Sequence, residues 1–481
     1  MASAVRSNVT RETTRSAARG AGGRASSAAR VLSALIFAGL VCVVPLSAIP
    51  YGSVEPLWTS LFEAAVFALA ALWAVEGALH GGWLSRAHAV AAPGLALAAY
   101  AFIQSVPLGA GGALSFDPYE TRLVALKLLA YTSFLALALR HVNSERRMRA
   151  LLYAVVTAGL ASALFGIARQ AGQHGREGFV LEYLQTGLGY AQFINKNHFA
   201  YAAEMSLGVL LGVVAGGGVS RAKTLVPLAL SLPVWAALVL SNSRGGLFAM
   251  LCQIIFLGAA FGVTRAGAKG ASVDARGVTR SRQTLAVRVS RSKAARALLV
   301  FVLLVTVVVG TVWVGGDAVA DRVASVGEDA SQPTGSARTG RVDIWAATWE
   351  MFKENPFAGV GLGGYWVAVS RFHKGSGESV PQQAHSDYLE TLASGGVMGA
   401  SLAVIFLLLL VKQSAPLLRR GSSFERAARL AALTGLCGVL VHSLVEFGLH
   451  VPSNAYAALA LAAVAACGPV ESSQKTRPSE Y

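Results

Sequence analysis

The sequence predicts an all-α polytopic membrane protein with about twelve transmembrane helices and one large loop outside the membrane. Two compositional observations support this class: 54% of the 481 residues are hydrophobic, and only 14% are charged. A soluble domain has roughly 45–50% apolar and about 25% charged residues, so the chain departs on both counts. The third observation is that apolar runs of about 17–25 residues, long enough to cross a hydrocarbon core, recur along the sequence.

Each apolar run is expected to form one spanning helix. An even number of spans places both termini on one side, and six arginines among the first 30 residues make this side the cytoplasm by the positive-inside rule. The expected spans are 31–50, 57–79, 88–107, 121–139, 150–171, 191–217, 224–241, 245–264, 297–316, 392–411, 430–450 and 453–469.

The segments between the spans suggest a division of the chain. Residues 1–30 are rich in Arg, Ser and Ala, which fits a disordered cytoplasmic tail, a transit peptide or a start codon placed too early. Residues 265–296 form a Ser/Arg-rich tract that is expected to be flexible and cytoplasmic. The expected parts are a basic tail (1–30), N-terminal transmembrane helices (31–264), a basic loop (265–296), a C-terminal transmembrane part (297–470) with an outer loop (317–391), and a cytoplasmic tail (471–481).

Charge and cysteine content exclude other classes. The net charge of +16 is carried by short basic segments between apolar runs, which indicates topology rather than nucleic-acid binding. The cysteines have no metal-ligand spacing and suggest no disulfide framework. All of them fall inside apolar runs: Cys42, Cys252, Cys437 and Cys467.

Polar residues converge at the outer membrane face, at the ends of expected spans and in the expected outer loop. Ionisable residues at membrane depth are energetically costly and usually mark a functional site. Five separated stretches contribute cations, amides or histidines: Asn195, Lys196, Asn197 and His198 in "FINKNHFA", Arg244 in "SNSRGG", Arg341 in "TGRVDIW", His385 in "QQAHSDYLE", and Glu446 with His450.

Each of these residues also has a purely structural interpretation. His442, Glu446 and His450 recur every four residues and are expected on one helix face, where hydrogen bonding within the bundle is favoured over a metal site. Four further charges have no partner that the sequence assigns: Glu63, Glu76, Lys127 and Glu204. The structural alternatives are an interfacial anchor for Arg244, a helix cap for Asn195, a surface charge for Lys196, a loop ion pair with Asp343 or Glu350 for Arg341, and a helix start without chemistry for His385, with Asp387 supporting the helix dipole.

The residue types point to a phosphate-bearing substrate. The chain lacks a Gly-x-x-x-x-Gly-Lys-Ser/Thr loop and a carboxylate cluster for Mg²⁺. Arg244 and Arg341 with Lys196 offer a cationic cradle, because arginine forks match phosphate oxygens. A histidine such as His385 is suited to removing a proton from a hydroxyl. The set therefore suits a phosphate-bearing lipid and a hydroxyl acceptor at the outer face.

Several motifs resemble one known family. "HSDYLETLASGGVMGA" resembles the His-Asn-x-Tyr-Leu…Gly-x-x-Gly signature of the O-antigen ligase and polymerase family, with Ser386 where Asn is common. "GRVDIWAATWEMFKENPFAGVGLGGY" resembles the segment just upstream in that family. "NKNHFA", "SNSRGG" and "HSLVEFGLHVPSNA" resemble three further family segments. The resemblance covers about residues 190–460, in the same order and topology.

The resemblance implies a GT-C-like helical fold with a periplasmic loop over a membrane cavity. It implies glycan transfer from undecaprenyl diphosphate to an acceptor sugar hydroxyl, without a metal, nucleotide or other cofactor. Arg244 and Arg341 would bind the diphosphate, and His385 would activate or orient the acceptor hydroxyl. Gly395 and Gly399 would let the following helix pack closely on a neighbour. Further candidates for substrate binding are Asn195, Lys196, Asn197, Glu446 and His450.

Three functions are compatible with this resemblance. A polymerase of O-antigen or exopolysaccharide repeats is favoured over an O-antigen ligase that attaches glycan to lipid A–core. A transporter, such as the relatives proposed to move inorganic carbon, is less favoured because polar residues gather at one face and no repeated halves are visible. The expected location is the bacterial inner membrane, with both termini cytoplasmic and the active face periplasmic. The expected partners are the lipid-linked donor, an acceptor glycan, the bilayer, a flippase and a chain-length regulator, without nucleic acid.

Overall fold

The protein is an all-helical bundle over the residues that its computed structural model describes, which are 27–80, 83–84, 86–107, 112–173, 189–269, 340–373 and 380–468. Extended pairing within these ranges is limited to two isolated bridges. Seven of the described helices are long and apolar enough to cross a membrane. The expected class, a polytopic helical membrane protein, is therefore confirmed, whereas the count of twelve spans stays a prediction.

The helices follow the expected spans closely. The expected span 297–316 and the tails 1–26 and 469–481 lie outside the described residues. Each other expected span meets one helix, and most of these helices begin or end within a few residues of the expected limits. The helices are Ser27–Ala48, α2 (Pro56–His80), α3 (Ala92–Ser105), α4 (Pro118–His141), α5 (Glu145–Gln173), α6 (Lys196–Ala215), α7 (Leu225–Leu240), α8 (Arg244–Lys269), α11 (Arg341–Glu354), α12 (Tyr365–Ala368), α13 (Asp387–Leu417), α14 (Ser423–His442) and α15 (Pro452–Ala466).

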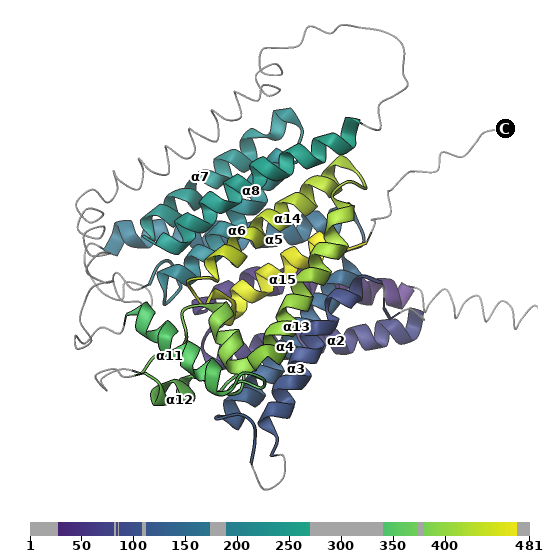
Figure 1. Ribbon diagram of the computed structural model, residues 1–481. Coiled ribbons are helices and arrows are strands. Elements are labelled where there is room, and N and C mark those ends of the chain that lie inside the picture. Colours follow the sequence, from purple (N-terminus) through teal and green to yellow (C-terminus); the bar gives the residue numbers. More distant parts are fainter. Residues whose placement is uncertain are drawn as a thin grey trace, which may run out of the picture.

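The centre of the bundle is the contact between α6 and α14, with α8 and α15 also packed on α14 (Figure 1). Small residues allow this close approach. A Cβ added to Gly208 would lie 2.6 Å from the Gly435 nitrogen, and one added to Gly212 would lie 2.4 Å from Ala431 Cα. Helix backbones that approach too closely to leave room for a Cβ atom are typical of small-residue interfaces in membrane bundles. The α6–α14 contact therefore fixes how the ends of these helices meet.

A small cap covers one end of the bundle. It consists of α11, α12 and the 3-10 turn Val369–Arg371, and Figure 1 shows it beside the start of α13. The cap has its own apolar core, which includes Met351 and Val360, and the Thr348 hydroxyl bonds the Tyr365 hydroxyl at 2.7 Å. The described part of the expected outer loop 317–391 is thus ordered and largely helical.

Helix α13 is broken at Gly396, which has φ 61° and ψ −167°. Residues 355–364, which connect α11 to α12 and which we call the cap loop, fill this break. Val360 and Gly361 donate to the Ala393 and Ser394 carbonyls, and Val397 donates to the Pro356 carbonyl. From α3, Gln104 Nε2 donates to the Ala358 and Ser394 carbonyls. The break leaves backbone N–H and C=O groups of α13 without partners in the helix. These bonds provide the partners, which buried backbone groups need.

The expected close approach at Gly395 and Gly399 is corrected by this break. A Cβ added to Gly399 would meet its nearest neighbours at an ordinary 3.8 Å, and one added to Gly395 would lie 3.3 Å from Leu362. A Cβ added to Gly396 would lie only 2.2 Å from the Phe357 carbonyl oxygen. Gly396 is the crowded position because the cap loop, rather than a neighbouring helix, packs against it.

The expected single helix over 430–450 is also corrected. Helix α14 ends at His442, and Glu446 and His450 follow in a turn segment that includes the 3-10 turn Gly448–His450. The three residues therefore do not share a helix face. Each of them reaches a different partner, because the chain changes direction between α14 and α15.

Candidate functional site

Glu446 is a buried carboxylate on which three distant parts of the chain converge. Its side chain is 1% exposed. Arg341 Nη2 and Asn197 Nδ2 donate to its Oε1 oxygen, the latter at 2.7 Å, and His385 Nδ1 lies 3.4 Å from its Oε2 oxygen. We call these four residues the Glu446 cluster. The structure thus brings together four of the residues that the sequence singled out.

The three partners of Glu446 lie at or next to the start of a helix. Asn197 is in the first turn of α6, which Asn195 caps by accepting from the Asn197 amide at 2.8 Å. Arg341 is the first residue of α11, and His385 lies two residues before α13. Helix termini place side chains at the end of a bundle, where water and membrane headgroups are within reach. The expected cap role of Asn195 is confirmed.

Electrostatics keep Glu446 ionised. Burial acts to raise the pKa of this carboxyl group, but the hydrogen bond with His385 and the charge of Arg341 outweigh it, so the pKa lies below its ordinary value. The carboxylate therefore holds its negative charge at neutral pH. It can orient an imidazole and a guanidinium at the same time.

His385 is held in a left-handed backbone conformation with φ 50°. This conformation is uncommon for residues other than glycine and costs about 1–2 kcal/mol. The neighbouring peptide groups are fixed on both sides: the Ala384 amide donates to Glu390 Oε2 at 2.8 Å, and the Asp387 amide donates to the Ser443 carbonyl at 3.1 Å. Strain that its surroundings enforce is common at functional sites.

The orientation of the His385 ring leaves one nitrogen for a substrate. Nδ1 faces Glu446, and the ring edge meets Phe447 at a centroid distance of 5.0 Å. The side chain is 32% exposed. When Nδ1 donates to the carboxylate, Nε2 carries the lone pair that accepts a proton from a hydroxyl group. This arrangement matches that of a histidine general base oriented by a carboxylate.

A second layer of buried carboxylates supports the His385 segment. The Ser443 hydroxyl donates to Asp387 Oδ2 at 2.6 Å, and His450 Nε2 lies 3.7 Å from Asp387 and 3.5 Å from Glu390. The sequence interpretation of Asp387 as a helix-dipole residue missed its burial, and Glu390 was not noticed at all. The only sequence signal is their position in the first turn after a cap, where acidic residues are common without any role in a site.

Arg244 and Lys196 begin α8 and α6 at the same end of the bundle. Arg244 is exposed, and Lys196 is half-buried. A Cβ added to the next residue, Gly245, would lie 2.5 Å from His442 Nε2 and 3.3 Å from the Val445 side chain. Helix α8 therefore starts beside the segment that carries Glu446, and a role of Arg244 in the site stays a prediction.

A second histidine–carboxylate pair lies deeper in the bundle. His442 Nδ1 is 3.1 Å from Glu204 Oε2, both side chains are 0% exposed, and the His442 ring stacks on Tyr201 at 4.3 Å. The sequence left Glu204 without a partner, because 238 positions separate the two residues. Within the described ranges, no group of three or more His, Cys, Asp or Glu residues is arranged to hold a metal ion.

Comparison with known families identifies part of this chain. Residues 228–404 match the model of the family described as O-antigen ligase. The matched range includes Arg244, Arg341 and His385. The comparison with curated proteins gives no match.

Proposed function

We propose that this chain, whose residues 228–404 match the model of the O-antigen ligase family, is a membrane glycosyltransferase that uses an undecaprenyl-diphosphate-linked glycan as its donor. The observation that carries the proposal is the Glu446 cluster, in which one buried carboxylate binds an arginine and orients a partly exposed histidine. The family is associated with membrane glycan processing of the ligase or polymerase type. The fold would be GT-C-like, with the cap on the periplasmic side of the inner membrane.

In the proposed reaction, the acceptor hydroxyl oxygen attacks the anomeric carbon of the donor sugar. The new glycosidic C–O bond forms as the bond from the anomeric carbon to the diphosphate breaks, and undecaprenyl diphosphate leaves. His385 Nε2 takes the hydroxyl proton, and Glu446 stabilises the resulting imidazolium through Nδ1. The proton then passes to solvent, which the 32% exposure of His385 allows.

Two arginines would bind the leaving diphosphate. The Arg341 side chain is 46% exposed although it contacts Glu446, so its fork can also meet phosphate oxygens. Arg244 begins α8 on the same side of the cluster and would provide the second cation. Donors aimed at charge that develops in the transition state accelerate such reactions most strongly. Asn195, Lys196, Asn197 and His450 would be further substrate contacts.

We favour a polymerase of O-antigen or exopolysaccharide repeats over an O-antigen ligase, on the form of the "NKNHFA" motif alone. Both enzymes use the same type of donor and differ in the acceptor. A polymerase adds repeat units to another lipid-linked chain, and a ligase transfers one chain to lipid A–core. A flippase and a chain-length regulator would act beside a polymerase.

The testing experiment uses purified protein in detergent with an undecaprenyl-diphosphate-linked oligosaccharide, and sizes the products on a gel. A ladder of multiples that is absent with His385→Gln supports a polymerase. A single transfer that requires added lipid A–core supports a ligase. No product with the native donor under either condition would overturn the glycosyltransferase proposal in favour of transport.

A further inference from the structure

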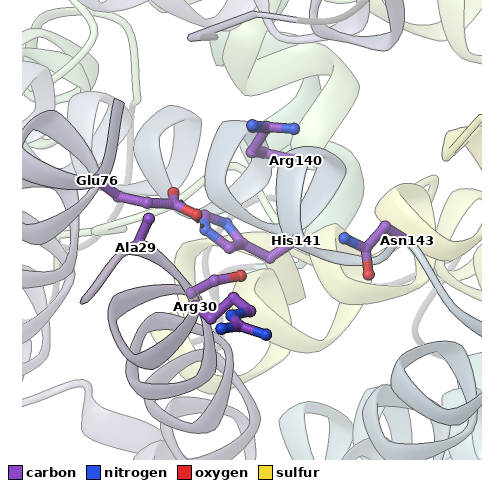
Figure 2. A pocket seen from close by; sticks show the side chains of 7 residues that line it. Ala29, Arg30, Glu76, Arg140, His141 and Asn143 are labelled. Atoms are coloured by element: carbon purple, nitrogen blue, oxygen red, sulfur yellow. Dashed lines mark hydrogen bonds and ion pairs between the residues drawn. The ribbon is translucent and has the colours of Figure 1, made fainter. Parts of the chain in front are cut away.

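A polar cavity of about 200 Å³ opens between three helices, away from the Glu446 cluster. Its wall is formed by Arg30 and Ser33 from the helix Ser27–Ala48, by Glu76 near the end of α2, and by Arg140 and His141 at the end of α4 (Figure 2). This volume is smaller than a typical site for a drug-sized ligand. It suits one small polar group.

The cavity and the Glu446 cluster lie at opposite ends of the bundle. Helix α4 has 24 residues, so its two ends are about 36 Å apart at ~1.5 Å per residue. Its first turn contacts the cap loop, because the Gly363 amide donates to Thr121 Oγ1 at 3.0 Å. Its last residue, His141, lines the cavity. In the proposed orientation the cavity therefore faces the cytoplasmic leaflet.

The carboxylate in the cavity wall is paired with a histidine. His141 Nδ1 lies 2.8 Å from the Leu137 carbonyl oxygen, and because a carbonyl only accepts, Nδ1 carries a hydrogen. The remaining nitrogen, Nε2, lies 3.0 Å from Glu76 Oε2. Glu76 therefore has a partner within the wall of the cavity.

The lining has a net positive formal charge, because it contains two arginines and one carboxylate. Figure 2 shows Arg30 and Arg140 on either side of the Glu76–His141 pair. A third arginine, Arg147 of α5, supports the wall from behind: it donates to Ser33 Oγ at 3.2 Å and to the His141 carbonyl at 2.9 Å. The Ser33 hydroxyl and the Asn143 amide add neutral polar groups to the lining. Such a lining favours an anion with several acceptor oxygens.

We propose that this cavity binds a phosphate group, namely the headgroup phosphate of an anionic phospholipid in the leaflet opposite the Glu446 cluster. Arginine forks match phosphate oxygens. Basic pockets between transmembrane helices at the cytoplasmic surface are a recurrent form of lipid site. The bound headgroup would connect the helix Ser27–Ala48 to α2 and α4, since each of these helices lines the cavity. This site is independent of glycan transfer.

The test measures lipid retention and thermal unfolding of the full chain after delipidation. The probes are phosphatidylglycerol, phosphatidylcholine and, as soluble sources, inorganic phosphate and glycerol phosphate. The variants are Arg30→Gln, Arg140→Gln and their combination. The matched control is Arg146→Gln, an exposed arginine at the same end of the bundle that does not line the cavity.

We expect phosphatidylglycerol to raise the unfolding midpoint of the parent protein more than phosphatidylcholine does. The double variant should lose more than half of this shift, and Arg146→Gln should keep it. Native mass spectrometry should show one fewer retained phosphatidylglycerol in the double variant, a readout that does not depend on stability. An equal shift with inorganic or glycerol phosphate would support the phosphate site and assign it to a soluble occupant. The proposal would be overturned if Arg146→Gln lost as much of the midpoint shift as the double variant. It would also be overturned if phosphatidylglycerol raised the midpoint no more than phosphatidylcholine does.

Discussion

The two histidine–carboxylate pairs near the end of α14 have the same chemistry and opposite surroundings. In the pair His385–Glu446, the imidazole is 32% exposed and the carboxylate also binds Arg341. In the pair His442–Glu204, both side chains are fully buried, and the ring is covered by Tyr201. The imidazole of the first pair is open to solvent, whereas the second pair is closed off from solvent and joins α14 to α6. Access and neighbouring charge, rather than residue type, distinguish a candidate base from a structural hydrogen bond.

The largest expected effect is the loss of transfer in His385→Gln. We expect glycan transfer to fall about 10²–10⁴-fold, the range for removal of a general base, with an unchanged thermal unfolding midpoint. The measurement is the initial rate with an undecaprenyl-diphosphate-linked donor. If the rate stays within a factor of two of the parent, the assignment of His385 is wrong.

The reverse pattern is expected for His442→Ala. This change leaves the Glu204 carboxylate buried without its partner, which should lower the free energy of unfolding by about 3 kcal/mol, with little effect on transfer per folded molecule. Denaturation in mixed micelles measures the loss. The double variant Glu204→Leu/His442→Leu is the control, because two apolar side chains should recover part of it. A rate as low as that of His385→Gln at parental stability would instead place this pair in the chemistry.

The break in α13 gives the next effect. Gly396→Ala should destabilise the protein by about 2 kcal/mol, because φ 61° with ψ −167° is open only to glycine and the added methyl group would meet the Phe357 carbonyl. The matched control is Gly399→Ala, whose nearest neighbours at 3.8 Å leave room for the methyl group. Thermal unfolding followed by tryptophan fluorescence compares the two. Equal decreases of the unfolding midpoint in Gly396→Ala and Gly399→Ala would mean that the break in α13 is not a fixed feature.

The smallest effect is the pH dependence of Glu446→Gln. The pKa of Glu446 is lowered in the folded protein, so its ionised form contributes stability above about pH 4.3, its ordinary unfolded pKa. This contribution is lost as the pH falls through the lower folded pKa. The parent should exceed Glu446→Gln by about 1–2 kcal/mol near pH 7. The two unfolding curves should converge below pH 4, and a gap that stays constant with pH would contradict the assigned charge.

The sequence was sufficient for the bundle because each expected span depends on local apolar length. It also predicted that Arg341, His385 and Asn197 approach one face, since Asn197 opens an apolar run and the other two lie in the expected outer loop. It failed where the answer depends on distant contacts: Glu76 with His141, Glu204 with His442, and Glu390 with the Ala384 amide. The regular spacing of His442, Glu446 and His450 was misleading, because α14 stops at His442 and the spacing continues without a helix. No local sequence pattern predicts that the break falls at Gly396 rather than at Gly395, since its position depends on the contact with the cap loop.

The break in α13 has a consequence for how a long glycan would move through the protein. The cap loop is joined to α13 by four backbone bonds and to α3 by the Gln104 side chain, so the cap cannot swing open as a lid unless these bonds break together. The cap and the two helices would thus move as one body. In the proposed polymerase, a growing glycan would pass this fixed cap, and His385 would meet each new chain end at a constant position relative to it.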